Sequence, residues 1–187
     1  MVFSSLPFLF LFLTVVLLVS HILPFRFRNF FLLLANLVFY AYGEPVYVLI
    51  MIGSILVNFF AGLLMDKQST QGRRRAVLVV GIVLNLAALG VFKYAGLFVS
   101  TLREIPGLSS LPEVDIALPI GISFYTFQAV SYLIDVYWDD CAASHNLINF
   151  ASYISLFPQL IAGPIVRYKD VNEQLVSRRE TPTLFNS

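Results

Sequence analysis

One apolar segment carries the residues best suited to chemistry. Residues 118–135 read LPIGISFYTFQAVSYLID, with polar and aromatic side chains inside an apolar run. Positions three or four residues apart share one face of a helix, and here that face holds Gly121, Phe124, Gln128, Ser131 and Asp135, with Tyr125 and Tyr132 beside it. Polar groups in an apolar setting need partners, so this stripe should face other helices or a cavity. It serves either interhelical hydrogen bonding or contact with a substrate.

Other candidate residues point less clearly to chemistry. Histidine is the usual general base near neutral pH, but neither His21 nor His145 lies in a pattern of base, nucleophile and orienting acid. We expect both at an interface or in solvent. The acidic residues Asp135, Asp139, Asp140 and Glu173 show no fixed metal-ligand spacing. The sequence therefore predicts no metal site, with Asp139 and Asp140 in a solvated loop.

Basic and amide residues mark the ends and the middle of the apolar segments. Arg73, Arg74 and Arg75 form a run that fixes membrane orientation by default, or alternatively binds an anionic headgroup or a phosphorylated ligand. Three asparagines lie within apolar segments, where interhelical hydrogen bonding is the expected role; they are Asn36, Asn58 and Asn85.

The composition indicates an integral membrane protein. Of 187 residues, 58% are hydrophobic, 15% aromatic and 12% charged, and the mean hydropathy is +0.82. Soluble domains carry about 25% charged residues, so this chain cannot coat a water-exposed surface of its size. A net charge of +1 provides no basic field, which argues against nucleic acid as a partner. A single cysteine, Cys141, excludes a disulfide within the chain.

The chain is predicted to be all-α and polytopic, forming a single membrane domain over residues 1–187. A bilayer core of roughly 30 Å needs about 20 apolar helical residues. Six segments approach this length, and we read them as transmembrane or re-entrant helices: Leu6–Leu23, Asn29–Tyr42, Val46–Met65, Ala76–Phe92, Ala117–Tyr137 and Leu147–Val166. Asn29–Tyr42 is short for a full span.

Basic residues predict the orientation of these segments. No Lys or Arg precedes the first apolar run and no small-residue cleavage site follows it, so we expect an uncleaved first span. Arg26, Arg28 and the basic loop Asp66–Arg75 then lie on one side, which is cytoplasmic by the positive-inside rule, and the N-terminus lies outside. The loop Tyr94–Ile116 should face outward.

The last apolar segment is predicted to be broken. Leu147–Val166 contains Pro158 and the pair Gly163-Pro164, and proline removes a backbone donor from a helix. A full span would place the basic residues after it on the outer side, against the positive-inside rule. We therefore expect a re-entrant segment that lines a cavity.

Two strings within these segments are typical of a known family. Residues 118–135, quoted above, and residues 156–168, LFPQLIAGPIVRY, closely resemble the membrane-bound O-acyltransferase family. The opening residues Met1–Ser5 and the tripeptide Phe92–Tyr94 fit the same pattern. The best match is the bacterial alginate O-acetyltransferase branch, and the D-alanyl transferase of teichoic acids is a more distant relative.

The resemblance implies a ring of transmembrane helices around a funnel, in the bacterial cytoplasmic membrane. It implies acyl transfer, without a bound cofactor, from a cytoplasmic donor such as acetyl-CoA or an acyl carrier. Periplasmic or extracellular partner proteins then pass the group to a polysaccharide such as alginate. The family's catalytic histidine lies in a later segment, beyond residue 187, and His21 and His145 do not match it. We therefore expect the chain to correspond to the N-terminal part of a family member, truncated before that histidine.

The resemblance also implies roles for residues of the two strings. Funnel-lining or substrate-binding roles are expected for Tyr125, Gln128, Ser131, Tyr132, Gln159 and Arg167, with Gln159 in the broken segment and Arg167 and Lys169 at the cytoplasmic mouth. A cation at that position favours a donor that carries phosphate. Two other functions stay open: a transporter or channel, since broken helices also mark transport sites, and a non-catalytic membrane scaffold.

Overall fold

The protein is helical throughout the part of the chain that the structure describes. This computed structural model describes residues 8–104, 118–156, 159–160 and 166–171, and no strand occurs among them. A π-helical stretch, η1 (Phe8–Leu13), leads into α1 (Thr14–Ile22), and the further helices are α2 (Phe25–Gly43), α3 (Val48–Asp66), α4 (Gln71–Arg103), α5 (Ile122–Tyr137) and α6 (Leu147–Ile154). The predicted all-α class is confirmed.

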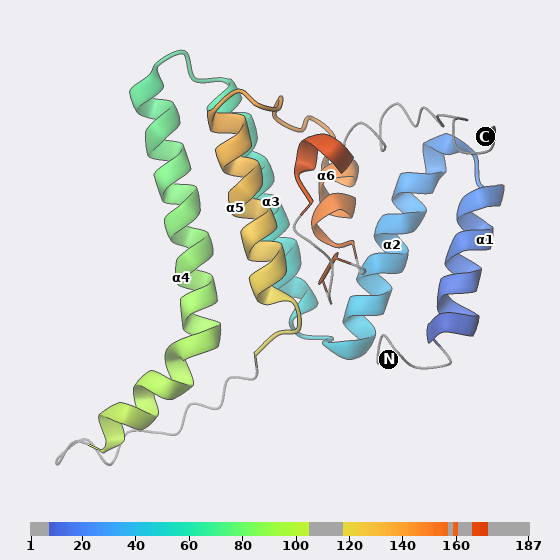
Figure 1. Cartoon of the computed structure of the whole chain (residues 1–187), viewed down its shortest axis with the longest axis horizontal. Coiled ribbons are helices and arrows are strands. Elements are labelled where there is room, and N and C mark those ends of the chain that lie inside the picture. Colours follow the sequence, from blue (N-terminus) through green and yellow to red (C-terminus); the bar gives the residue numbers. More distant parts are fainter. Residues whose placement is uncertain (1–7, 105–117, 157–158, 161–165, 172–187) are drawn as a thin grey trace, which may run out of the picture.

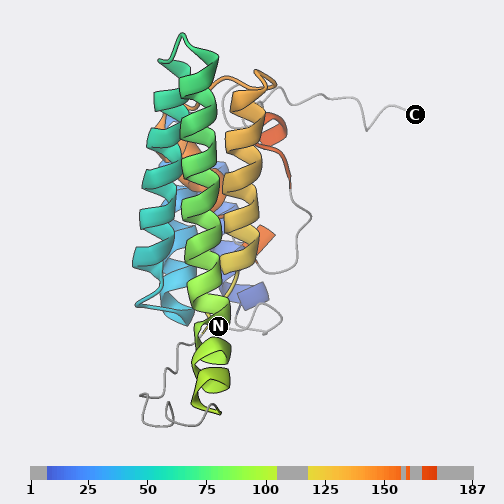
Figure 2. The same cartoon turned by 90° about the vertical axis from the view of Figure 1, so that its left-hand side faces the viewer.

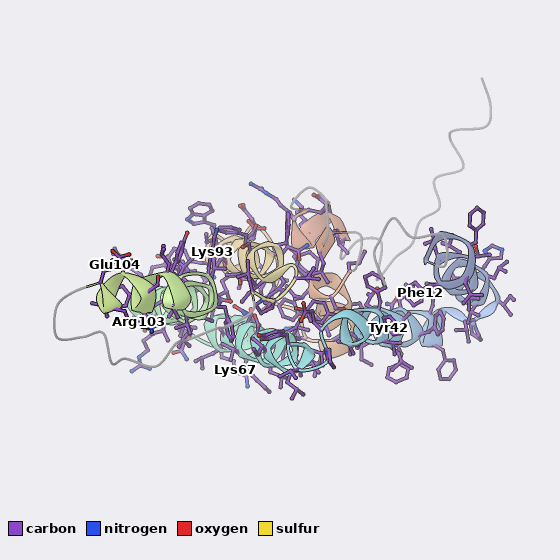
Figure 3. The ribbon with its side chains drawn as sticks, turned by 90° about the horizontal axis from the view of Figure 1, so that it is seen from below. Phe12, Tyr42, Lys67, Lys93, Arg103 and Glu104 are labelled. Atoms are coloured by element: carbon purple, nitrogen blue, oxygen red, sulfur yellow. The ribbon has the colours of Figure 1, made fainter. Side chains whose placement is uncertain are left out.

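The helices form a wall about two layers thick. Helices α2 and α3 lie in one layer and α5 and α6 in the other, while α4 and α1 close opposite ends (Figures 1 and 3). Contacts join α3 to α5, α2 to α6, and α4 to both α3 and α5. Figure 3 places Arg103 of α4 and Phe12 of η1 at the two ends of this wall. The core therefore lies between the layers, where α5 faces α3.

Helices α3 and α4 are long and apolar enough to cross a membrane. Only 33% of the most apolar window of α3 and 11% of that of α4 is buried, so neither resembles the core helix of a soluble protein. Large apolar side chains such as Leu49, Phe60 and Val83 are exposed on their outer faces, as expected for contact with lipid. Among the described helices only these two meet the length and hydropathy criterion, so the count of six spans stays a prediction.

Helix α4 is longer than the sequence predicts. It begins at Gln71, inside the expected loop, and continues through Lys93 to Arg103, so the span Ala76–Phe92 was too short and the loop assigned to Tyr94–Ile116 was wrong up to Arg103. No proline interrupts the stretch, so the helix continues past the charged Lys93. At 1.5 Å per residue its 33 residues reach about 50 Å, more than a bilayer core of roughly 30 Å. Figure 2 shows its last turns extending beyond α3 and α5.

Two other predicted boundaries were wrong for local reasons. Helix α2 begins at Phe25, directly after Pro24, and its 19 residues exceed the predicted Asn29–Tyr42. Proline suits a helix start because its fixed φ and missing N–H cost nothing there. Helix α5 begins at Ile122 rather than Ala117, because Gly121 adopts a left-handed conformation with φ of 77°. Pro119 therefore precedes the helix instead of occupying its first turn.

The predicted segment Leu147–Val166 begins with a short helix, α6, that ends at Ile154. An early end agrees with the predicted break in this segment. Asn146 caps α6 by accepting hydrogen bonds from the amides of Ile148 and Asn149, at 2.9 and 3.3 Å. The helix ends at Ile154, and Pro158, Gly163 and Pro164 lie outside the described residues. The predicted break is consistent with this early end, while the re-entrant path between these residues stays a prediction.

The two ends of this segment meet beside the same part of α5. The backbone amide of Ser144, before α6, donates to the hydroxyl of Tyr132 at 3.0 Å. The ring of Tyr168, after the broken segment, lies 5.1 Å from the ring of Tyr132. Residues before and after the predicted break therefore contact the same side chain of α5.

Candidate functional site

The candidate site begins with the buried face of α5. Tyr125, Gln128, Tyr132 and Asp135 are each at most 4% exposed, and they follow one another at intervals of three or four residues. Of the predicted stripe, Ser131 is half-buried, and Phe124 is 38% exposed. The buried face is thus turned slightly toward the two tyrosines, because these large side chains fill the space between the layers.

A side-chain hydrogen bond joins the two strings that resemble the acyltransferase family. The Gln128 amide nitrogen donates to the side-chain oxygen of Gln159. Gln128 lies in the middle of α5 and Gln159 follows α6, so two parts of the chain 31 residues apart meet at these amides. The structure therefore brings together two residues that the sequence analysis could only name separately.

Gly121 allows the same two strings to approach at the start of α5. A Cβ atom added at Gly121 would lie 2.9 Å from the backbone oxygen of Leu160, closer than real contacts allow. The left-handed φ of 77° is itself unfavourable for residues with a side chain. Glycine is therefore required here for its conformation and for the close backbone approach.

Several polar atoms on the buried face of α5 lack hydrogen-bond partners among the described residues. They are the hydroxyl of Tyr125, the side-chain oxygen of Gln128 and one carboxylate oxygen of Asp135. A buried polar group without a partner costs about 1–3 kcal/mol, and native proteins leave few of them. This face therefore has unused hydrogen-bonding capacity that a polar ligand could satisfy.

Tyr132 lies in a cluster of aromatic rings. Its ring centroid is 4.6 Å from that of Phe150, and Tyr168 lies 5.2 Å from Tyr153 in the same cluster. The Tyr153 hydroxyl donates to the backbone oxygen of Val166 at 3.0 Å. Gly62 of α3 lies against the Tyr132 hydroxyl, leaving no room for a Cβ atom. These contacts hold α3, α5, α6 and the segment at Tyr168 together, and sequence spacing alone gave no sign of them.

Arg167 lies apart from Gln128. Its side chain is exposed, as is that of Lys169, and Arg167 lies within electrostatic range of the buried carboxyl of Asp135. The structure thus places one exposed cation near the end of α5 that carries Asp135. It does not bring Arg167 into contact with the glutamine pair.

The three consecutive arginines have different environments. Arg74 contacts both carboxylate oxygens of Asp139, at 2.6 and 3.0 Å, and donates to the backbone oxygen of Val136 at 2.9 Å. The guanidinium holds the pKa of the Asp139 carboxyl below its usual range. Arg74 therefore ties the start of α4 to the end of α5, whereas Arg73 and Arg75 remain exposed.

Asn58 and Asn85 form the interhelical bridge that the sequence predicts. Each amide nitrogen donates to the oxygen of the other, at 3.1 and 2.7 Å, and each also donates to a backbone oxygen of its own helix at 2.8 Å. Beside this pair, α3, α4 and the start of α5 enclose a largely apolar groove of about 350 Å³. The pair fastens α3 to α4.

The remaining titratable candidates lie outside the buried face. His145 is 3.4 Å from the carboxylate of Asp66, and both side chains are largely exposed, while His21 is also exposed. Burial raises the pKa of the Cys141 thiol to about 11, so it stays protonated near neutral pH. In the described ranges, no group of three His, Cys, Asp or Glu side chains is placed to hold a metal ion.

Curated relatives align with nearly the whole chain. A protein named "Probable alginate O-acetylase" from Pseudomonas aeruginosa is 44% identical over 99% of this chain, and its namesake from Pseudomonas putida is 40% identical over 100%. A peptidoglycan O-acetyltransferase of Helicobacter pylori is 31% identical over 82% of the chain. The chain spans 36%, 39% and 35% of these relatives' lengths. No family model and no solved structure matches it.

These matches confirm the resemblance to the alginate branch of the membrane-bound O-acyltransferases. The relatives' names agree with the acyltransferase class that the two strings predict.

Proposed function

We propose that this chain, related along its length to the alginate O-acetylases, is part of a membrane O-acetyltransferase. The hydrogen bond between Gln128 and Gln159 carries the proposal, because it unites the two family-like strings on one buried face. In our proposal the wall of helices forms one side of a funnel. Through it an acetyl group passes from a cytoplasmic donor to a polysaccharide hydroxyl on the outer side, in alginate or a similar exopolysaccharide.

The described residues would position the reacting group. Acetyl transfer forms a bond between a hydroxyl oxygen and the carbonyl carbon, while the donor's leaving group departs and takes up a proton. We propose that Tyr125, Gln128 and Gln159 contact the group in transit. Ser131 and Tyr132 would form the wall behind them, since Tyr132 is fully buried.

The base for this transfer is not among the residues we assign. His21 and His145 are both exposed, away from the buried face, and the family resemblance implies a histidine beyond residue 187. We propose that the longer protein supplies that base. This chain would then provide the polar wall and the entrance.

Arg167 would lie at the cytoplasmic entrance. Exposed guanidinium and ammonium groups bind phosphate well, and Arg167 and Lys169 are two such groups on the segment that returns beside α5. We propose a phosphate-bearing donor, acetyl-CoA or an acyl carrier. Soluble partners outside the membrane would complete transfer to the polymer.

The proposed function also implies in which membrane the chain lies and how it is oriented there. We propose the bacterial cytoplasmic membrane, with the N-terminus outside and the basic end of the wall, at Lys67 and Arg73, in the cytoplasm. Cysteines placed singly at His145, whose side chain is exposed, and at Ser177, in a Cys141→Ala background, test this with a membrane-impermeant thiol reagent. Both should be labelled from the cytoplasmic side. Labelling from opposite sides would contradict the re-entrant segment.

Polymer acetylation tests the proposed function. In a strain whose polymer is acetylated through the reading frame that contains this chain, Gln128→Ala and Arg167→Ala should each reduce acetylation at least severalfold. Arg73→Ala, which removes an exposed cation outside the site, is the matched control and should leave acetylation unchanged. Membrane protein levels are measured in parallel. Normal acetylation in both site variants would remove these residues from the site.

A further inference from the structure

A second groove, of about 400 Å³, lies between α3 and α4. Among the described helices, these two alone line it, so it is separate from the buried face of α5. Its lining is apolar and includes Phe60, Ala61 and Leu64 of α3 and Val77, Val80 and Leu84 of α4. Phe60, Val80 and Leu84 are exposed, so the groove opens toward the surroundings of the wall rather than toward its core.

Two exposed cations lie at the end of this groove. Arg73 comes four residues before Val77 and seven before Val80, so it lies on the face of α4 that lines the groove. Lys67 directly follows α3, three residues after the groove-lining Leu64. Both cations belong to the loop region that joins α3 to α4 at one end of the wall (Figure 1). The apolar groove therefore leads to a basic end.

Neither cation has a counter-ion in the described part of the chain. The nearby ion pair with Asp139 belongs to Arg74, and Asp66 lies beside His145 instead, at 3.4 Å. The first turn of α4 also contains no acidic residue. A cation there is unfavourable because the helix dipole is positive at its N-terminal end. A bound anion would offset this repulsion at Arg73.

Charge and polarity together select the occupant. An apolar groove that opens to the bilayer can take up an acyl chain, and basic residues just beyond the end of a membrane span attract phosphate headgroups. A phospholipid with a net negative charge carries both groups in one molecule. A zwitterionic lipid would fill the groove equally well, but its ammonium group would oppose the attraction to Lys67 and Arg73. An apolar helix would leave both cations without a counter-ion.

We propose that an anionic phospholipid binds between α3 and α4. Its acyl chain lies in the groove against Phe60 and Val80, and its phosphate group is held by Lys67 and Arg73. This site goes beyond the proposed function and does not depend on acyl transfer. It also selects between the two roles that the sequence leaves open for the basic run, because Arg74 ties α4 to α5 while Arg73 binds a headgroup.

Quenching of tryptophan fluorescence by brominated lipid tests the proposal at the groove itself. The full 187-residue chain carries Phe60→Trp together with Trp138→Phe, so that its single tryptophan lines the groove. It is reconstituted in vesicles of phosphatidylcholine and phosphatidylglycerol, with bromine on the acyl chains of one lipid or the other. The quenching gives the ratio of the two lipids' association constants at this position. Phosphatidylglycerol should be preferred by about three- to tenfold.

Matched variants separate the two cations from the general charge of the loop. The double variant Lys67→Gln with Arg73→Gln should bring the ratio down to about one. Arg75→Gln removes an exposed cation from the same turn, but position 75 comes two residues before Val77 and so lies on another face of α4. It should keep the preference. Circular dichroism verifies the helix content of each variant, and all three side chains are exposed.

Three results would overturn the proposal. Equal quenching by the two lipids in the chain with both cations would show that the groove does not select the headgroup. An unchanged preference in the double variant would show that Lys67 and Arg73 do not bind it. Quenching by neither lipid would show that protein, not lipid, covers the groove. Polymer acetylation in Gln128→Ala and Arg167→Ala judges the proposed function separately, so either proposal can fail while the other stands.

Discussion

Two regions of the protein bury polar side chains in an apolar interior: the bridge between α3 and α4, and the inner face of α5. They differ in whether those side chains have hydrogen-bond partners. Between α3 and α4, the amide groups of Asn58 and Asn85 bond to each other and to backbone oxygens. On α5, the Tyr125 hydroxyl and the Gln128 oxygen have no partner in the described part of the chain. The first arrangement is complete by itself, whereas the second is not.

This difference suggests separate roles: the bridge between α3 and α4 stabilises the fold, and the buried face of α5 serves function. A satisfied polar pair holds two helices together, because breaking it would leave a buried amide without a partner. An unsatisfied polar face lowers stability, so its presence is explained by what it binds. Substitutions in the bridge should therefore lower the free energy of unfolding, whereas removing polar groups from the α5 face should lower acetylation and leave stability nearly unchanged.

The largest loss of stability is expected at Gly121. Gly121→Ala combines a left-handed φ of 77° with a Cβ atom 2.9 Å from the Leu160 oxygen, a backbone atom that cannot easily move. The two effects together should cost about 2–5 kcal/mol. Unfolding by denaturant measures this. Gly53→Ala, where the added Cβ meets nothing within 4 Å, is the control and should be neutral or stabilising by about 0.5–1 kcal/mol.

A smaller loss should follow from breaking the amide bridge. Asn58→Leu or Asn85→Leu alone leaves the side-chain oxygen of the other asparagine buried without its partner, while its nitrogen keeps the bond to its own helix. This should cost about 1–3 kcal/mol. The double variant removes both polar groups and should recover most of that loss. A double-mutant cycle of unfolding free energies measures the coupling. Additive losses in the double variant would show that the two amides do not depend on each other.

The contact between Arg74 and Asp139 should have a smaller effect that depends on pH. Because Arg74 lowers the pKa of the Asp139 carboxyl, the contact stabilises the protein above the pKa of the unfolded carboxyl, about 3.9. The stabilisation is lost as the pH falls through the still lower folded pKa. Arg74→Gln should therefore destabilise at neutral pH, and its difference from wild type should shrink below about pH 4. Arg73→Gln, at an exposed position, should show no such pH dependence.

The smallest effect on stability is expected at Tyr125. Tyr125→Phe keeps the ring and removes a hydroxyl that has no partner among the described residues, so the unfolding free energy should stay the same or rise slightly. This contrasts with the loss at Asn58. A fall comparable to that of Asn58→Leu would show that the hydroxyl has a structural partner.

The sequence predicts those features that depend on residue type and local periodicity. The all-α class, the buried positions Gln128 and Asp135, and the bridging role of Asn58 and Asn85 could be predicted, because polar residues at helical spacing in apolar segments must face inward. The break after Ile154 followed from nearby prolines. These are properties of single segments.

Features that depend on packing between distant segments were not predictable. The sequence could not pair Gln128 with Gln159 or place Tyr168 against Tyr132, since both contacts depend on how the chain returns after α6. Tyr40 lies in an aromatic-rich stretch that is typical of a membrane boundary, so its burial was not predicted. The length of α4 exceeds the predicted span Ala76–Phe92, because the apolar pattern marks the membrane-spanning part of a helix and not its helical continuation past Lys93.

Acetylation of the polymer by two matched variants tests the central contrast most directly. In the reading frame that contains this chain, Gln128→Leu is compared with the double variant Asn58→Leu with Asn85→Leu, per unit of protein in the membrane. We predict that Gln128→Leu loses at least most of the acetylation, while the double variant retains it. Full acetylation with Gln128→Leu, or equal loss in both variants, would contradict the assignment of the α5 face to function.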